Sequence, residues 1–276
     1  MSFPVEFNLA GHRVPAHAVL ELAAYVVGVQ FYFFLRRRGR LGAGAGMSVD
    51  QNLWLIVACV LGAMVGSKIL AWAESPLDYW SRRGTPLVLL SGKTIVGGLL
   101  GGWIATELVK KKFGVKRATG DLFVFPLVIG IAIGRVGCFL TGLPDHTYGV
   151  HTSLPWGVDF GDGPRHPTQL YEIGFVLLLG CLIFWKSRGE YWNGELFVWF
   201  MAGYLGFRFL VEFIKPRHVY FGVLSAIQMA CLIGLIECAR RLARGPLTLP
   251  SPPSTGARGE GEYRGEGNEA VQVGNE

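Results

Sequence analysis

The sequence predicts an all-α membrane protein, a polytopic bundle of seven transmembrane helices. The 276-residue chain has a mean hydropathy of +0.37. It is 51% hydrophobic and only 17% charged, which is too apolar and too poor in charge for an ordinary water-soluble domain. Several runs of about 20 residues are apolar on every side, long enough to cross a hydrocarbon core of roughly 30 Å. Soluble folds are therefore excluded.

Seven segments have the length and apolar character of a span, namely residues 17–35, 51–73, 86–109, 121–141, 167–185, 194–214 and 219–239. The first lacks a small-residue cleavage site, so we expect a retained helix rather than a signal peptide. The membrane domain is expected to cover residues 1–244. Residues 245–276 contain 7 Gly and 4 Pro and hardly any large apolar residue, so burial cannot offset the entropy of folding. This composition predicts a disordered cytoplasmic tail.

Basic residues are divided unevenly between the two sides of the predicted bundle. Fourteen follow the odd-numbered spans, whereas six lie on the opposite side. The positive-inside rule therefore predicts that the N-terminus is outside and the C-terminus is in the cytoplasm. The net charge is +6, and because the tail carries −3, residues 1–244 carry +9; basic membrane loops account for this charge, so no nucleic-acid partner is implied. The five cysteines are scattered, and their spacing predicts neither a disulfide framework nor a metal site.

Six spans each carry one ionisable residue at a similar depth. Counting about 1.5 Å per helical residue places these side chains roughly 6 to 11 Å below the outer ends of the spans. They are Glu21, Lys68, Lys93, Arg135, Glu172 and Arg208. A charge at mid-bilayer costs about 2.5 to 3.5 kcal/mol even on lenient scales, so the layer indicates a polar site opening toward the outer leaflet.

A second interpretation of this layer stays open, in which acids and bases pair only to hold the bundle together. Glu212, nearer the surface, would supply a third acid for such pairing. Glu107 and Glu237 lie near the inner ends of their spans, where their carboxylates reach the interface, and they indicate no site.

Three segments of the sequence contribute further residues to the predicted site. Gly134–Gly142 (GRVGCFLTG) closes the fourth span, where its glycines allow a headgroup to approach the backbone. Arg135 in this segment offers a planar fork that can bind phosphate through two hydrogen bonds. The segment HPTQLYE opens the fifth span and places Gln169 and Glu172 on one helical face.

The third segment, YLGFRFLVE, lies in the sixth span. Its i, i+4, i+8 spacing puts Tyr204, Arg208 and Glu212 on one stripe, so the two outer members can hold the guanidinium. Arg135 and Arg208 are at matched depth on two different helices. Together they predict a clamp for one anionic lipid headgroup.

These three segments, in this order, resemble those of the prolipoprotein diacylglyceryl transferases. Members of that family are bacterial inner-membrane enzymes with seven spans and an outer N-terminus. They move a diacylglyceryl group from phosphatidylglycerol to the lipobox cysteine of a preprolipoprotein and release glycerol 1-phosphate. The resemblance covers nearly all of residues 17–240, and the Gly97–Gly101 run and Gln228 also match family positions.

The resemblance implies that Arg135 and Arg208 hold the lipid phosphate and that the Tyr204 hydroxyl is essential. We therefore expect three catalytic residues, which are Arg208, Tyr204 and Lys93. The expected substrate-binding residues are Arg135, Arg208, Gln169, Glu172, Glu212 and Gln228. The implied partners are phosphatidylglycerol, other membrane lipid and a preprolipoprotein peptide. The implied location is the bacterial plasma (inner) membrane, with the active site toward the outer leaflet.

Three positions depart from the family pattern, as in a divergent branch. Val96 stands where the family has a histidine, its proposed general base, directly before the Gly-Gly-Leu run. Cys138 and Thr141 stand where the family has two asparagines. Lys93, one turn before Val96, can compensate by adding positive charge beside the phosphate or by acting as a base.

The reaction suits two fixed cations, because the leaving phosphodiester becomes a phosphomonoester and gains negative charge. No metal-ligand spacing, nucleotide loop or nucleophile elbow is present in the sequence, so no cofactor is implied. Loop 142–166, rich in aromatic and acidic residues, is a candidate lid or peptide platform. Two alternatives stay open: a lipid-binding relative without chemistry, and a transporter, which the absence of an internal repeat disfavours.

Overall fold

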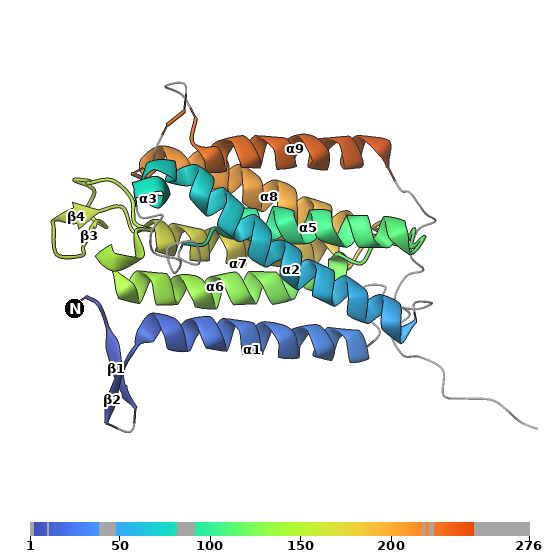
Figure 1. The fold of residues 1–276 in the computed structure, drawn as a ribbon, viewed down its shortest axis with the longest axis horizontal. Helices are drawn as coiled ribbons and strands as arrows, with labels where there is room; N and C mark the ends of the chain where they lie inside the picture. Colours follow the sequence, from blue (N-terminus) through green and yellow to red (C-terminus); the bar gives the residue numbers. More distant parts are fainter. Residues whose placement is uncertain are drawn as a thin grey trace, which may run out of the picture.

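The computed structural model describes residues 3–9, 11–38, 48–81, 92–216, 219–220 and 224–245. Within these residues the chain is dominated by seven long helices that run along a common axis (Figure 1). They are α1 (Ala16–Arg37), α2 (Val49–Glu74), α5 (Ile95–Lys112), α6 (Val124–Thr141), α7 (Thr168–Lys186), α8 (Glu195–Val211) and α9 (Ala226–Arg244). The start of α1 and the end of α9 lie at opposite ends of the bundle (Figure 1).

Five segments are long and apolar enough to cross a membrane: Ala16–Arg37, Asp50–Glu74, Asp121–Thr141, Thr168–Lys186 and Glu195–Ile214. They fall on the predicted spans one, two, four, five and six, and together they indicate a multi-pass membrane protein. Helices α5 and α9 occupy the positions of the other two predicted spans but carry more charge, with Lys110–Lys112 ending α5 and Arg240, Arg241 and Arg244 ending α9.

Helices α5 and α9 also begin later than the apolar runs suggest. The Thr94 hydroxyl accepts a hydrogen bond from the Gly97 backbone N–H and caps α5. Ser225 and Gln228 form a reciprocal capping box at the start of α9. Side chains that bond the first free backbone N–H groups fix where a helix begins, so these caps override hydropathy. Residues 86–91, the start of the third predicted span, lie outside the described residues, as do residues 246–276 of the predicted tail.

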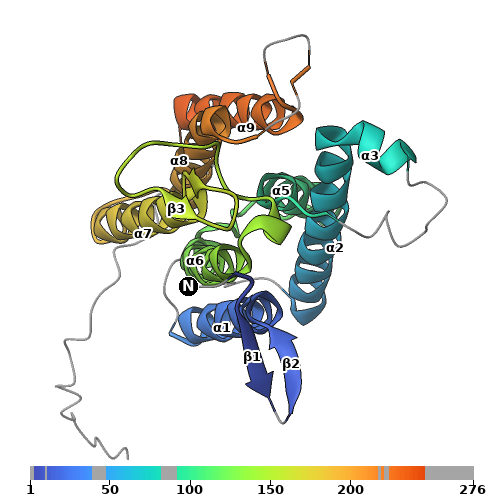
Figure 2. The same cartoon turned by 90° about the vertical axis from the view of Figure 1, so that its left-hand side faces the viewer.

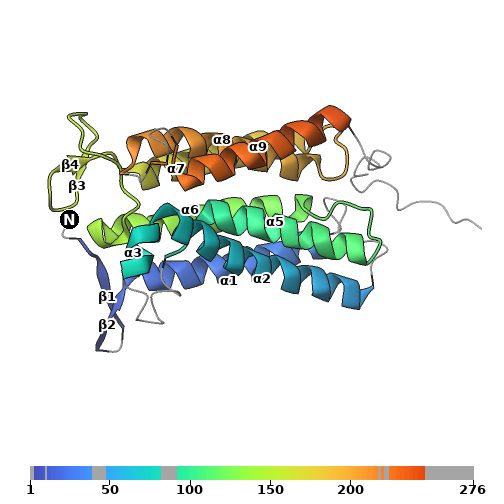
Figure 3. The same cartoon turned by 45° about the horizontal axis from the view of Figure 1, so that its top comes forward.

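Helices α5 and α6 lie between α7, α8 and α9 on one side and α1 and α2 on the other (Figure 2, Figure 3). The approach of α2 to α5 is very close. A Cβ on Gly66 would lie 2.4 Å from the Gly97 carbonyl oxygen, and one on Gly101 would lie 2.2 Å from that of Gly62. Only glycine permits such backbone contact, which is how membrane helices pack without a hydrophobic driving force.

The fold is all-α as predicted, apart from two small antiparallel sheets at one end of the bundle, which we call the strand end (Figure 1). Strand β1 (Glu6–Leu9) pairs with β2 (His12–Pro15) across a turn at Gly11, whose φ is +83°. Strand β3 (Val158–Asp159) pairs with β4 (Pro164–Arg165). The Asp159 carboxylate accepts from the backbone N–H groups of Gly161 and Gly163 and closes that turn.

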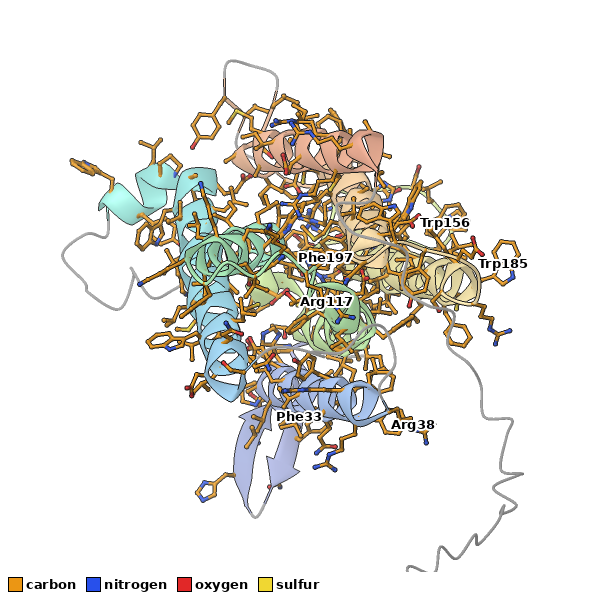
Figure 4. The ribbon with its side chains drawn as sticks, turned by 90° about the vertical axis from the view of Figure 1, so that its right-hand side faces the viewer. Phe33, Arg38, Arg117, Trp156, Trp185 and Phe197 are labelled. Carbon is orange, nitrogen blue, oxygen red and sulfur yellow. The ribbon has the colours of Figure 1, made fainter. Side chains whose placement is uncertain are left out.

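The opposite end, which we call the basic end, carries the Arg and Lys residues that finish α1, α5, α7 and α9. Figure 4 looks onto this end, with Arg38 at the rim and Trp185 pointing away from the bundle. Trp185 is 76% exposed, whereas Phe197 packs edge-on against Trp103 in the interior. Large apolar side chains exposed along the helices, such as Leu22, Met64 and Leu178, indicate surfaces that face lipid.

Candidate functional site

A buried carboxylate, Glu172, lies at the centre of the site near the strand end. Its Oε2 atom is 2.9 Å from Arg135 Nε and 3.4 Å from Arg208 Nη1. Its Oε1 atom accepts a 2.5 Å hydrogen bond from the Tyr204 hydroxyl. Arg208 Nη2 in turn lies 3.0 Å from Glu212 Oε2. Helices α6, α7 and α8 and the 3-10 turn Glu212–Ile214 after α8 therefore bring five of the predicted site residues together, and we call them the Glu172 cluster.

The Glu172 cluster is almost completely shielded from solvent. Tyr204 is 0% exposed, Glu172 2%, and Arg208 4%. Arg208 Nε is also buried, and the described residues offer it no hydrogen-bond acceptor. Buried polar groups are normally paired, so an unpaired guanidinium N–H indicates room for an anionic ligand that completes the site.

Lys215 extends this cluster just beyond the end of α8. The sequence predicts only a loop cation at this position, but the side chain is buried and lines the same cavity as Arg135 and Arg208. Burial, together with the two neighbouring guanidinium groups, lowers the pKa of Lys215 to about 7. The sequence does contain a signal for this residue: Lys215 follows Glu212 by three residues and Arg208 by seven, a spacing that places side chains on one helical face.

A second group of charges lies on the other side of the strand end. Glu21 of α1 accepts a hydrogen bond from Lys93, and the Tyr25 hydroxyl donates to the same Glu21 oxygen at 3.0 Å. The Lys68 ammonium donates to the Gly92 carbonyl at 2.7 Å. The predicted layer of six ionisable residues thus occupies the strand end in two groups, with Lys93 in the more exposed one.

Members of both groups line one cavity of about 2290 Å³ that extends along the bundle between α1, α2, α5 and α6. Lining residues near the strand end include Glu21, Lys93, Arg135 and Arg208, while apolar side chains such as Ile131 line it further along. Gly134 also lines it, and a Cβ there would meet nothing within 4 Å. A polar end joined to a long apolar channel has the chemistry to hold an anionic lipid.

The two predicted glutamines have different surroundings. Gln169 is 1% exposed, and neither its amide nitrogen nor its amide oxygen has a partner among the described residues. Gln228 is engaged in packing the helices, since its Oε1 accepts from the Ser225 N–H and its Nε2 donates to the Phe209 carbonyl. The role of either glutamine in binding substrate remains a prediction.

Three residues whose proximity the sequence did not predict meet beside the Glu172 cluster. One ring nitrogen of His17, the Cys138 sulfur and a carboxylate oxygen of Asp145 all lie within 4.8 Å of one another. They come from α1, α6 and the 3-10 turn Leu143–Asp145, so spacing along the chain could not reveal them. All three line the cavity, and Cys138 Sγ is 3.8 Å from Arg135 Nη1.

The loop between α6 and α7 covers the strand end of the site. Its Arg165 guanidinium lies 4.7 Å from the centre of the Tyr148 ring and bonds Asp162. This partner lowers the pKa of the exposed Asp162 carboxyl. Backbone hydrogen bonds from Gly149 to His166 and from Val150 to Ile214 tie the loop to the start of α7 and the end of α8. The loop is therefore held in place over the cavity.

Sequence comparisons identify relatives of this chain. The family profile described as prolipoprotein diacylglyceryl transferase matches residues 4–241. A phosphatidylglycerol–prolipoprotein diacylglyceryl transferase of Bordetella avium is 31% identical over 262 residues, covering 88% of this chain and 97% of the relative. The protein of the same name from Nitratidesulfovibrio vulgaris strain DP4 is 32% identical over 243 residues, covering 83% and 89%. The one from Geobacter sulfurreducens is 32% identical over 213 residues, covering 73% and 79%.

The matched region includes every residue of the Glu172 cluster. It begins before α1 and extends to within three residues of the end of α9, so it spans all seven long helices almost completely. The chain therefore belongs to the prolipoprotein diacylglyceryl transferase family.

Proposed function

We propose that this protein transfers the diacylglyceryl group of phosphatidylglycerol to the lipobox cysteine thiol of preprolipoproteins and releases glycerol 1-phosphate. The observation that carries the proposal is the pair of buried guanidinium groups, Arg135 and Arg208, on one carboxylate at the polar end of a lipid-sized cavity. Family membership supports the same activity.

In this proposal Arg135 and Arg208 bind the phosphate and stabilise the charge that grows on it as the carbon–oxygen bond breaks. Because Glu172 and Glu212 hold both guanidinium groups before substrate arrives, little reorganisation is needed in the transition state. Tyr204 donates to Glu172 and fixes its orientation between the two arginines. Lys93 adds positive charge at the cavity mouth. Gln169, whose amide has no partner among the described residues, completes the binding of the substrate, and Gln228 supports the site through its hydrogen bond to the Phe209 carbonyl.

We further propose that α5 and α9 cross the bacterial inner membrane together with the five apolar spans, giving seven crossings. The strand end, with the site, then faces outward, and the basic end faces the cytoplasm, as the positive-inside rule requires. The charges of α5 and α9 support this arrangement because they gather in the last turns, where Lys and Arg reach the interface. The preprolipoprotein peptide reaches the site from the outer leaflet, beneath the loop between α6 and α7.

The test replaces a bacterium's own transferase with this chain under conditions in which the host enzyme is depleted. We expect an unmodified preprolipoprotein to be converted to its lipid-shifted form on a gel. Arg208→Ala, expressed and inserted to the same level, should leave the precursor unmodified. Well-inserted wild-type protein that also leaves the precursor unmodified would contradict the transferase proposal and favour a lipid-binding relative without chemistry.

A further inference from the structure

His17 occupies a place in the site that family resemblance does not explain. The position where the family carries its histidine is filled here by Val96, an apolar residue that is 1% exposed and unable to move a proton. The thiol of the substrate cysteine has an unperturbed pKa of about 8.5 and requires a base to become a nucleophile near neutral pH. A base must therefore come from another part of the cavity.

The ring of His17 is oriented by carboxylates on both sides. Its Nε2 atom lies 3.4 Å from Glu21 Oε2, one helical turn later on α1. Glu21 is itself held by Lys93 and Tyr25, so its position is fixed. A carboxylate this close to one ring nitrogen favours the tautomer with the proton on that nitrogen and leaves the lone pair on the other nitrogen.

That other nitrogen, Nδ1, faces the interior of the site. It is buried and has no hydrogen-bond partner among the described residues, and Asp145 Oδ1 lies 3.7 Å away. Asp145 accepts a hydrogen bond from the Thr147 hydroxyl, which keeps its carboxylate in place. An imidazolium formed at His17 would thus lie between two fixed carboxylates, which stabilise its charge as in catalytic triads.

Cys138 lies close both to His17 and to Arg135, one of the two arginines proposed to bind the phosphate. Its sulfur lies within 4.8 Å of a ring nitrogen of His17 and 3.8 Å from Arg135 Nη1, so the histidine and the arginine both lie close to the same sulfur. All three residues line the cavity. A substrate thiol entering this region would meet His17 while the lipid phosphate is bound by Arg135.

We infer that His17 is the general base of this protein, taking the role proposed for the family histidine at the position of Val96. This inference rests on the proposed function. The substrate S–H proton moves to Nδ1 of His17. The sulfur forms a bond to the carbon of the diacylglyceryl unit that bears the phosphate in phosphatidylglycerol. The carbon–oxygen bond to the phosphate breaks, and its electron pair leaves on glycerol 1-phosphate, bound by Arg135 and Arg208. Glu21 and Asp145 are positioning residues.

The experiment uses the purified full-length protein in vesicles containing phosphatidylglycerol, with a lipobox peptide as acceptor. His17→Ala should lower turnover by about 10²–10⁴-fold, the usual contribution of a general base, and added imidazole should restore part of it. His12→Ala is the matched control, because His12 is an exposed histidine on β2, outside the loop that covers the site. Its turnover should equal that of the wild type.

A second acceptor separates a base from a merely structural residue. In a peptide whose lipobox cysteine is replaced by selenocysteine, the selenol is already ionised at neutral pH and needs no base. The defect of His17→Ala should largely disappear with this peptide, and His17→Asn, which retains polarity and volume, should behave in the same way. A variant that is equally defective with both peptides, or one that turns over the cysteine peptide as the wild type does, would overturn the inference.

Two further results separate the role of His17 from the activity itself and from metal binding. If the wild-type protein fails to turn over either peptide, the proposed function fails, whatever His17 does. His17, Cys138 and Asp145 also have the donor set of a divalent-cation site. Loss of wild-type turnover with a chelator and its recovery with Zn²⁺ would assign them to a metal and overturn the role of His17 as a base. We expect turnover to be unchanged by the chelator.

Discussion

Charged side chains enter the helical bundle at both ends, but their surroundings differ. In the Glu172 cluster, at the strand end, the side chains of Arg135, Glu172 and Arg208 are 7%, 2% and 5% exposed. At the basic end, Arg241 pairs with Glu107 and Glu237, and the three side chains are 28%, 36% and 41% exposed. We call this second set the Glu107 cluster.

The difference in burial indicates different roles for the two clusters. Side chains of the Glu107 cluster keep part of their hydration, and such pairs form at little cost and add little stability. Removing the Glu172 cluster from water costs several kcal/mol per ion by general estimates, which mutual attraction only roughly offsets. Burial of such a cluster across three helices therefore supports our proposal that it serves binding or chemistry, and not stability alone.

The largest effect that tests this comparison is expected from Arg208→Ala. Loss of one of two cations aimed at the developing phosphate charge should lower turnover by about 10²–10³-fold. The assay is transfer of the diacylglyceryl group to a lipobox peptide in phosphatidylglycerol vesicles.

Arg208→Lys is the matched control, because it keeps the charge but not the planar fork that contacts Glu172 and Glu212. It should recover only part of the loss. Turnover by Arg208→Ala close to that of the wild type would mean that the Glu172 cluster has a structural role only.

Gly134→Leu tests whether the space beside the Glu172 cluster is a ligand site. A Cβ at Gly134 meets nothing within 4 Å, and the residue lines the cavity, so the fold should tolerate the larger side chain. We expect phosphatidylglycerol binding to weaken by about 1–3 kcal/mol, because overpacking a filled space costs that much. Titration of the purified protein with phosphatidylglycerol in detergent measures the change.

Gly206→Leu provides the control. A Cβ at Gly206 also meets nothing within 4 Å, but this residue lies on α8 and is not among the residues that line the cavity. Its melting temperature and lipid affinity should stay near those of the wild type. Equal losses of affinity in both variants would show that Gly134 does not border the lipid site.

A pH effect of intermediate size is expected from Lys215. Its pKa of about 7 means that the side chain becomes cationic as the pH falls through 7. Phosphatidylglycerol affinity should therefore be higher at pH 6 than at pH 8, by about 1 kcal/mol or roughly fivefold. Lys215→Met should flatten this dependence. A pH dependence that survives the substitution would assign it to another group.

The sequence predicted part of the Glu172 cluster from spacing and from the positions of the apolar runs. Glu212 pairs with Arg208 as expected, whereas the Tyr204 hydroxyl donates to Glu172 instead. Tyr204, Arg208 and Glu212 share one helical face by their spacing, and apolar runs set the depth of Arg135 and Glu172. The five apolar spans follow from the same runs. Local signals of this kind depend on neighbours along the chain, which the sequence displays directly.

Other features depend on tertiary contacts or on short caps, which periodicity does not display. The starts of α5 and α9 are set by Thr94 and Ser225 rather than by hydropathy. The meeting of His17 with Cys138 and Asp145 requires α1 to pack against α6, which no local pattern reveals. Gln228 likewise matched a family position, but its contact with the Phe209 carbonyl appears only in the fold.

The smallest effect is expected from Arg241→Ala in the Glu107 cluster. The variant loses ion pairs of 2.9 Å to Glu237 and 3.4 Å to Glu107, both partly solvated, so stability should fall by about 1 kcal/mol or less. Turnover should match the wild type, because the basic end lies far along the bundle from the phosphate clamp (Figure 1). Thermal unfolding in detergent and the peptide transfer assay, run beside Arg208→Ala, measure both quantities. If Arg241→Ala reduced turnover as much as Arg208→Ala does, burial would not distinguish the two clusters, and the basic end would have to take part in the reaction.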